Sequence, residues 1–230
     1  MKIRLAMAMC GVVALSGASF AADAPELKTD KEKISYSIGM DIGENLKRSS
    51  VEVDPDLLAR GLKDSYGGGK TILTEEQARQ AIADFQKTMM EKQAETMKIL
   101  SEKNKADGEK FLAENAKKEG VKVLSSGLQY KEITPGTGKS PKSDDTVTTH
   151  YKGTLIDGTE FDSSYKRGEP ATFPVSGVIP GWTEALQLMK EGAKWQLFVP
   201  SNLAYGERGA GQVIGPNATL IFEVELLTVK

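Results

Sequence analysis

The feature that most constrains this chain is a long stretch without a helix breaker. No glycine occurs between Gly69 and Gly108, and no proline occurs between Gly69 and Pro135. Thr74-Glu75-Glu76-Gln77 at its start has the pattern of a capping box. The sequence therefore predicts one helix from Glu75 to about Lys117, which would be roughly 65 Å long at ~1.5 Å per residue. Such a helix is longer than a small domain needs, so it divides the chain into two parts.

The second half of this predicted helix is highly charged. After Met97 the apolar residues thin out, and pairs such as Lys98–Glu102 and Lys103–Asp107 place opposite charges four residues apart. A helix that is polar on all sides is typical of a solvated bridge between domains. A charged flexible linker is the alternative, but the capping box and the absence of breakers favour a helix. Gly108 is predicted to be the weakest point, because glycine costs about 1 kcal/mol relative to alanine.

Two shorter helices are predicted before the long one. Thr29-Asp30-Lys31-Glu32 is a capping box, and Asp54 followed by Pro55 is typical of a helix start. Apolar residues recur at helical spacing after both starts, at Ile34, Ile38, Ile42, Leu46, Leu57, Leu58 and Leu62. Some sixty residues rarely bury enough apolar surface to be stable alone. We therefore expect this half to form a homodimer.

The first residues have the pattern of a secretory signal peptide. Lys2 and Arg4 precede a short apolar run, and Ser19-Phe20-Ala21 offers small residues for cleavage after Ala21. Removal of residues 1–21 would also remove Cys10 and leave 28 basic against 32 acidic residues, a net charge of −4. The remaining chain has no thiol, no apolar run long enough to span a membrane and no basic excess that would indicate nucleic-acid binding.

The hydrophobic period changes after Gly120. Leu128 and Tyr130, and later Val147, Thr149 and Tyr151, alternate as they do in half-buried strands. The same alternation recurs at Trp195–Val199 and at Leu220–Leu226, while Pro180–Met189 reads as a short helix. A short helix on a twisted antiparallel sheet makes this part α+β.

Six segments in this part, over roughly residues 120–230, resemble the FK506-binding-protein family of peptidyl-prolyl isomerases in order and spacing. They are Tyr151-Lys152-Gly153, Gly158-Thr159, Phe161-Asp162-Ser163-Ser164, Val178-Ile179-Pro180-Gly181-Trp182, Ala204-Tyr205-Gly206, and Ala218-Thr219-Leu220 leading to Phe222. With the signal peptide and the helical first half, the whole chain is similar to members of the macrophage infectivity potentiator type.

The resemblance implies a domain organisation that agrees with the patterns above. Residues 1–21 would be the signal peptide, 22–73 a helical dimerisation domain and 74–118 a long connecting helix. Residues 119–230 would form an isomerase domain, a twisted antiparallel sheet around a short helix. Relatives dimerise through the first half, with the long helix holding two catalytic domains apart.

The resemblance also implies a site. Trp182 would form its floor, and Tyr151, Phe161, Val178, Ile179, Ile214 and Phe222 its walls. Tyr205 would offer a hydroxyl to a substrate carbonyl, and the Ile179 amide would hold the carbonyl on the other side of the proline. Asp162 would polarise the amide or orient Tyr151, although a purely structural role for this carboxylate stays open. We expect no role for His150, the only histidine. Ala171 stands at a position aligned with a rim aromatic, and Ala210, Gly211 and Gln212 replace a usual His-Pro-Gly.

The chemistry expected of such a pocket needs no covalent step, metal or cofactor. Rotation about an X–Pro bond is opposed by a barrier of ~18–20 kcal/mol from amide resonance. Because water stabilises the planar, dipolar amide, an apolar pocket should lower this barrier by excluding water. The expected function is a secreted isomerase that assists protein folding. Its expected partners are proline-containing peptides and unfolded proteins, with macrolides of the FK506 type as inhibitors.

Two other hypotheses remain at this point. The dimer could be a chaperone or partner-binding protein, in the periplasm or on the cell surface, for which isomerisation is secondary. A structural or adhesive surface protein with a degenerate pocket is the third, and the complete aromatic set argues against it. The expected location is outside the inner membrane of a bacterium: the periplasm, the outer membrane or the cell surface.

Overall fold

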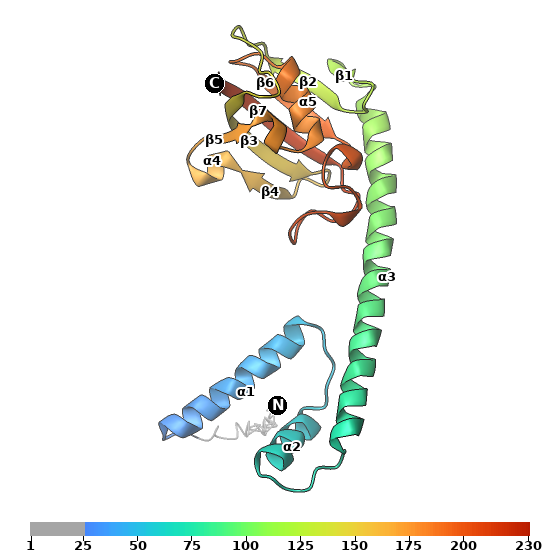
Figure 1. Cartoon of the computed structure of the whole chain (residues 1–230), viewed down its shortest axis with the longest axis vertical. Coiled ribbons are helices and arrows are strands. Elements are labelled where there is room, and N and C mark those ends of the chain that lie inside the picture. Colours follow the sequence, from blue (N-terminus) through green and yellow to red (C-terminus); the bar gives the residue numbers. More distant parts are fainter. Residues whose placement is uncertain (1–25) are drawn as a thin grey trace, which may run out of the picture. The chain divides into compact units, whose positions relative to one another are not determined.

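The computed structural model describes residues 26–230, which form two compact units, one up to Thr74 and one from Glu75 to Lys230 (Figure 1). The predicted signal peptide, with Cys10, lies outside the described residues. Within residues 26–230, no helix combines the length and the apolar character that crossing a membrane would require.

The first unit contains α1 (Asp30–Arg48) and α2 (Pro55–Tyr66). Both predicted starts are confirmed. The Thr29 hydroxyl accepts a hydrogen bond from the Glu32 amide at 3.2 Å, and the Glu32 carboxylate accepts one from the Thr29 amide at 2.9 Å. Asp54 accepts from the amides of Asp56 and Leu57. Neither helix buries a residue within the single chain.

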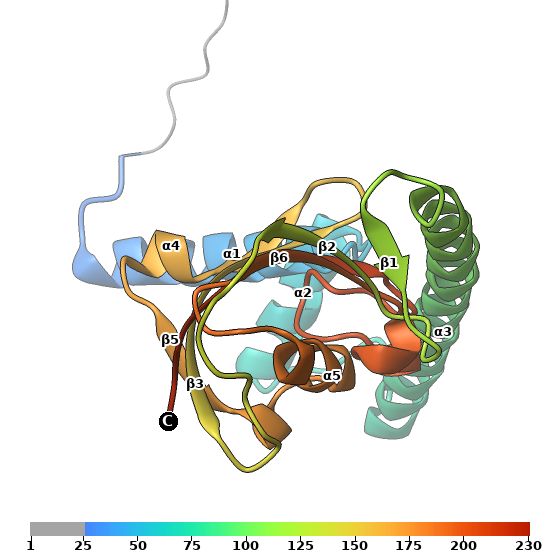
Figure 2. The same ribbon diagram turned by 90° about the horizontal axis from the view of Figure 1, so that it is seen from above.

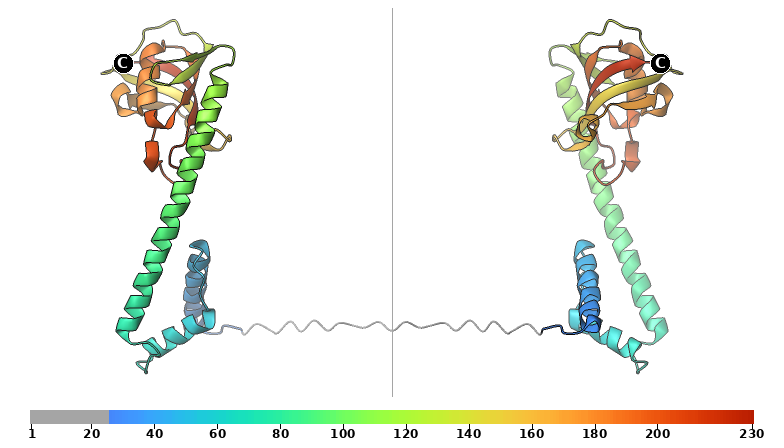
Figure 3. Two further views of the ribbon diagram at one scale, coloured as in Figure 1. Left: turned by 90° about the vertical axis from the view of Figure 1, so that its right-hand side faces the viewer. Right: turned by 90° about the vertical axis from the view of Figure 1, so that its left-hand side faces the viewer.

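The second unit begins with α3 (Glu75–Asn115), the predicted long helix. Its first part extends away from the sheet, and its last part runs along one side of it (Figures 1 and 3). The interpretation of this last part as a solvated bridge is wrong. Phe111 lies 6.0 Å from Phe198 between ring centroids, and the buried Asn115 donates its amide to the Gln129 side chain at 3.0 Å. This packing could not be read from the sequence, because many of its contacts are made by amide and small residues such as Asn115 and Gly108 and not by an apolar stripe.

Gly108 is also not the weak point that was predicted. It is buried, and a Cβ built on it would lie 2.3 Å from the hydroxyl oxygen of Thr219. The absence of a side chain therefore lets α3 approach the chain just before the last strand. The glycine is required by packing at this position.

Seven antiparallel strands follow, in the sheet order β1-β2-β6-β7-β3-β4, with β5 paired to β3. They are β1 (Val121–Val123), β2 (Gln129–Thr134), β3 (Thr146–Leu155), β4 (Glu160–Ser163), β5 (Ala171–Pro174), β6 (Lys194–Val199) and β7 (Leu220–Val229). The alternation read from the sequence is confirmed: Val147, Thr149 and Tyr151 on β3, like Leu220, Phe222, Val224 and Leu226 on β7, are buried.

The sheet curves around α5 (Pro180–Leu188), the predicted short helix (Figure 2). Trp182, Ala185 and Leu186 of this helix are buried. Gly181 allows the helix to lie close to β6, because a Cβ there would be 2.6 Å from a methyl of Val199. A one-turn helix, α4 (Ser164–Arg167), follows β4. This arrangement confirms the α+β class and gives the helix and the sheet one shared core.

Candidate active site

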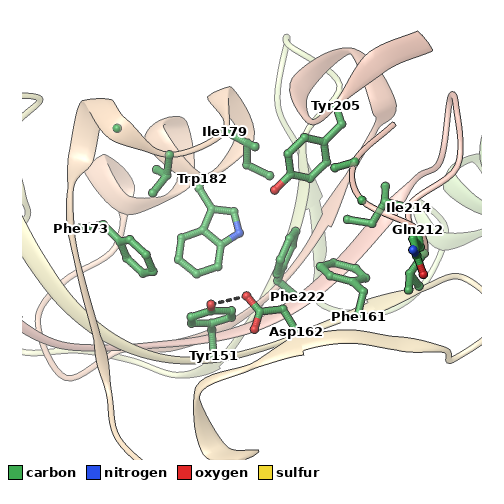
Figure 4. Close-up of a pocket in the computed structure, with 15 residues that line it drawn as sticks. Tyr151, Phe161, Asp162, Phe173, Ile179, Trp182, Tyr205, Gln212, Ile214 and Phe222 are labelled. Atoms are coloured by element: carbon green, nitrogen blue, oxygen red, sulfur yellow. Dashed lines mark hydrogen bonds between the residues drawn. The ribbon is translucent and has the colours of Figure 1, made fainter. Parts of the chain in front are cut away.

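A cavity of about 730 Å³ opens between α5, β3, β4, β7 and the long loop that joins β6 to β7 (Figure 4). The structure brings all nine predicted site residues to its lining: Tyr151, Phe161, Asp162, Val178, Ile179, Trp182, Tyr205, Ile214 and Phe222. They come from segments as much as seventy residues apart, so only the folded sheet and helix place them together.

Aromatic rings form the floor and one wall of this pocket. Trp182 meets Tyr151 edge-on with centroids 5.3 Å apart, and it meets Phe222 edge-on at 5.2 Å. Phe161 and Phe222 pack in the same way at 5.5 Å. Gly153 on β3 makes room for them, because a Cβ there would lie 2.6 Å from the Phe161 ring and 2.9 Å from that of Phe222. Edge-to-face pairs are the favoured geometry of aromatic rings, so the walls are held rigidly.

Among the described residues, Asp162 is the only carboxylate of the lining, and it belongs to a network of three side chains. The Tyr151 hydroxyl donates to its Oδ2 at 2.5 Å (Figure 4), and Arg167 pairs with its Oδ1. Arg167 also donates to the Tyr151 hydroxyl at 2.8 Å and lies over the Tyr151 ring. The polar groups at this corner of the pocket are therefore satisfied by one another.

In this network the pKa of Asp162 is lowered and the pKa of Tyr151 is raised. Burial alone would raise the pKa of Asp162, but the hydrogen bonds from Tyr151 and Arg167 outweigh it and leave that pKa below its ordinary value. Burial, with the hydrogen bond to Asp162, raises the pKa of the Tyr151 hydroxyl. At neutral pH the corner therefore holds an ionised carboxylate and a protonated phenol.

Three donors have no acceptor among residues 26–230. Tyr205 is 41% exposed, and Figure 4 shows its hydroxyl directed into the cavity. The Ile179 amide precedes the first turn of α5 and no backbone bond from it is formed. The Trp182 indole Nε1 is buried and unpaired. A ligand with carbonyl oxygens could accept hydrogen bonds from this side of the pocket.

The structure adds lining residues that sequence reasoning missed. Phe173 stands in the pocket wall, 6.1 Å from Trp182 between ring centroids. On this strand, only Ala171 was expected from the sequence to lie at the pocket rim. Since both residues lie on the same face of β5, two positions apart, the strand alternation could have revealed Phe173. Arg167 was missed because nothing in the spacing links α4 to Tyr151.

The remaining sequence expectations can be placed in the same way. His150 lies outside the pocket lining, where its Nδ1 is 3.0 Å from the Ser164 hydroxyl and its ring stacks on Tyr165. Ala210, Gly211 and Gln212 do line the pocket. No cluster of three or more potential metal ligands occurs in the part of the chain that the structure describes.

The sequence matches two family models that together span most of the chain. Residues 137–227 match FKBP-type peptidyl-prolyl cis-trans isomerase, and residues 31–131 match the domain amino terminal to FKBP-type peptidyl-prolyl isomerase. The chain is similar to the outer membrane protein MIP of Legionella longbeachae, with 53% identity over 100% of this chain and 99% of the relative. It is also similar to the peptidyl-prolyl cis-trans isomerase Mip of Coxiella burnetii, with 47% identity over 99% of this chain and 98% of that protein.

A solved structure agrees with this assignment. The crystal structure of FkpA from Escherichia coli matches with a TM-score of 0.71 and 39% identity, covering 89% of this chain and 99% of that one. The match extends over both units, so the helical first half belongs to the shared architecture. The resemblance read from the six sequence segments is thus confirmed, and the chain belongs to the FKBP-type peptidyl-prolyl cis-trans isomerases.

Proposed function

We propose that the pocket around Trp182 accelerates X–Pro isomerisation by taking the amide out of water. The observation that carries this proposal is the lining: among the described residues, six aromatic and five aliphatic side chains surround a single, internally paired carboxylate. The planar amide is the more dipolar form, so the loss of water raises its free energy more than that of the twisted amide. The pocket then binds the transition state better than the ground state, as catalysis requires.

Each polar group is assigned a role by its position. The proline ring lies on Trp182, between Tyr151 and Phe222. The free hydroxyl of Tyr205 and the Ile179 amide each donate to a substrate carbonyl, which holds the peptide across the pocket. Asp162, kept ionised by the hydrogen bonds from Tyr151 and Arg167, fixes the Tyr151 ring and faces the substrate amide as it twists. Macrolides of the FK506 type would occupy the same place as inhibitors.

Val178→Thr tests the role of water exclusion. Threonine has the shape of valine but adds a hydroxyl to the partly buried pocket wall. Bound substrate would cover this hydroxyl, and a covered polar group without a partner costs about 1–3 kcal/mol. We expect kcat/KM on a short proline peptide to fall about fivefold or more. Val123→Thr is the control, because Val123 is 52% exposed and lies outside the pocket. Wild-type kcat/KM in Val178→Thr would contradict desolvation as the source of the rate enhancement.

We also propose that the chain is a homodimer joined through α1 and α2. The apolar faces of these helices remain exposed in one chain, and they border a groove of about 720 Å³ lined by Ile42, Leu46, Val51, Leu58 and Leu62. A second copy is the simplest cover for this surface. The two pockets would then act on long unfolded chains, and this arrangement supports the alternative in which chaperoning is the main task.

The two functions can be separated by one substitution. Trp182→Ala removes the pocket floor and should abolish acceleration on peptides. Refolding of a client protein without proline should be unchanged if the dimer also acts as a chaperone. Loss of both activities in a folded Trp182→Ala dimer would exclude an independent chaperone role.

We further propose that the protein works outside the inner membrane of a bacterium. The support comes from the signal-peptide pattern of residues 1–21 and from the name of the Legionella relative, an outer membrane protein. Fractionation of cells that express the whole chain would test this. Recovery of an uncleaved chain in the cytoplasm would contradict it.

A further inference from the structure

The loop between β6 and β7 is held from outside by α3. The Asn104 side chain donates to the Pro216 carbonyl at 2.8 Å, and the Asn217 side chain donates to the Ser101 hydroxyl at 2.8 Å. These bonds join positions more than a hundred residues apart in the sequence. Ser101 and Asn104 lie almost one turn apart on α3, so they present one face of the helix to the loop.

Asn217 links this helix to the loop segment that carries Tyr205. Its backbone amide donates to the Gly206 carbonyl at 2.8 Å, and Gly206 directly follows Tyr205. Asn217 adopts a positive φ of 55°, in the left-handed region that asparagine tolerates better than most other side chains. The bond from its side chain to Ser101 helps to hold this conformation.

Ile214 is supported from the same side. A Cβ on the neighbouring Gly215 would lie 3.0 Å from the Asn104 amide nitrogen and 3.1 Å from a methyl of Leu100, so α3 packs directly on the loop backbone. The loop closes on itself through paired backbone bonds between Ala210 and Ile214, at 2.8 and 3.2 Å. Figure 4 shows Ile214 facing the cavity. The loop is thus one chain thick, with α3 on one side and the pocket on the other.

A second hollow confirms how thin this wall is. A groove of about 570 Å³ lies between α3 and the loop, and it shares Gly211, Gln212, Val213 and Ile214 with the pocket. These four loop residues therefore form the wall between the two spaces. A shift of α3 relative to the loop changes this wall of the pocket directly.

These contacts are separate from those that fasten α3 to the sheet. Phe111 on Phe198, Asn115 on Gln129, and the Gln129 amide on the Leu112 carbonyl at 2.9 Å lie two or more turns further along the helix. They attach α3 to β2 and β6. The hydrogen bonds of Ser101 and Asn104 outside α3 go to the loop instead.

We propose that Ser101 and Asn104 are positioning residues for the proline pocket, which set the place of Ile214 and Tyr205 through the Pro216–Asn217 segment. The inference rests on the proposed function of that pocket and adds the connecting helix to its machinery. If the loop were loose, its ordering on substrate binding would cost free energy and weaken binding. The contacts with α3 avoid this cost by keeping the loop ordered before substrate binds. Loss of these contacts should therefore raise KM more than it changes kcat.

The test uses the chain from Ala22 to Lys230 with Ser101→Ala, Asn104→Ala and the double substitution. A net hydrogen bond contributes about 1 kcal/mol, so KM should rise roughly fivefold for each single change. Ser101→Thr keeps the hydroxyl and should restore the wild-type KM. Lys105→Ala, at an exposed position on the same helix, should leave KM unchanged. The Ile214 methyl resonances should shift in the alanine variants, while those of Ile221 on β7 stay in place.

The outcomes distinguish this inference from the proposed function. A double variant with wild-type KM and an unshifted Ile214 signal would overturn the positioning role and leave the isomerase pocket intact. A lower melting temperature with unchanged KM would also overturn it, because that result assigns the contacts to stability alone. If the double variant does not fold, the single variants and Ser101→Thr still decide the question. An inactive wild-type chain would instead refute the proposed function.

Discussion

The two units of this chain contain similar apolar patterns but treat them differently. In the unit from Glu75 to Lys230, Leu128, Leu197 and Leu226 have no exposed surface. In α1 and α2, Ile34, Leu57 and Leu62 are 60%, 61% and 62% exposed. Both sets follow the period of their element, so periodicity reports which face is apolar and not what covers it.

This difference in burial arises because the two units offer their apolar side chains different packing partners. The sheet residues meet α5 and one another, which gives a core within one chain. Two helices of 19 and 12 residues cannot enclose their apolar faces between them. The core of the first unit is therefore incomplete within one chain, since no residue of α1 or α2 is buried, whereas all the residues that line the pocket belong to the second unit.

The largest expected effect concerns this incompleteness. Deletion of residues 22–90 should convert a dimer into a monomer, because it removes α1 and α2 but keeps the part of α3 that contacts the second unit. The monomer should keep full activity on short peptides and act less well on unfolded proteins, which are long enough to contact both arms. Sedimentation at micromolar concentration measures the change.

A point substitution gives the same test without deletion. Ile38→Asp places a charge on the exposed apolar face of α1 and should dissociate the dimer, whereas Lys33→Gln on the same helix should not. A wild-type protein that sediments with the mass of one chain would refute the dimer and the two-armed arrangement that depends on it.

The second prediction concerns how much the end of α3 stabilises the sheet. A fragment of residues 106–230, which begins after the loop contacts of Ser101 and Asn104, should be more stable than one of residues 121–230 by about 3–5 kcal/mol. The shorter one loses the packing of the partly buried Phe111 on Phe198, worth about 1–3 kcal/mol, and two hydrogen bonds between α3 and Gln129, worth about 1 kcal/mol each. Urea unfolding followed by tryptophan fluorescence measures the difference. Equal stability would mean that the end of α3 contributes nothing to the second unit.

The third effect lies within the pocket. Asp162→Leu should lower kcat/KM about tenfold, equivalent to about 1.4 kcal/mol, because it leaves Arg167 unpaired and frees the Tyr151 ring. Tyr151→Phe keeps the ring and should cost less. Glu160→Gln is the matched control, since Glu160 lies on the same strand and pairs with Lys166 at 2.9 Å outside the pocket. Unchanged turnover in Asp162→Leu would assign its carboxylate a purely structural role.

The pH dependence should follow the same network. The folded-state pKa of Asp162 lies below its ordinary value of 3.8, so its contribution to stability is present above that pH and is lost as pH falls through the folded pKa. The raised pKa of Tyr151 keeps its hydroxyl protonated at neutral pH. We expect kcat/KM to be flat from about pH 5 to 9. Asp162→Asn should reduce the acid limb of the stability profile, to which Glu32 and Asp157, whose pKa values are also lowered, contribute as well. An unchanged limb would mean that Asp162 contributes nothing to it.

The features that could be predicted from the sequence are those that depend on residues close together in the chain. The capping residues Thr29 and Asp54 locate two helix starts, because a cap depends on residues within one turn. The alternation on β3 and β7 identified the buried faces. The pocket residues were found because six segments resemble one family, and their spacing carries the geometry that composition alone does not.

The contacts that were missed join distant segments through polar or small groups. Asn104 to Pro216 and Asn115 to Gln129 are hydrogen bonds whose partners no periodicity pairs. Arg167 reaches Tyr151 from a one-turn helix after β4. Gly108 looked like a defect in a helix because glycine lowers helix propensity. Glycine is needed at position 108 because Thr219 packs against it, and only the folded structure shows this contact.

The smallest predicted effect tests that last point with two helical glycines, one in each unit. In Gly108→Ala the gain of about 1 kcal/mol in helix propensity should be outweighed by overpacking of about 1–3 kcal/mol, because the added Cβ would lie 2.3 Å from the Thr219 hydroxyl. Gly61→Ala on α2 meets nothing within 4 Å in the single chain and should show the propensity gain alone. The double variant Gly108→Ala/Thr219→Ala should recover most of the loss, since the next atom, the Thr219 Cβ, lies 3.3 Å away. Calorimetric melting of the four proteins measures these differences. A stabilised Gly108→Ala would show that α3 can move away from the loop without cost, and it would weaken the case for α3 as a support of the pocket wall.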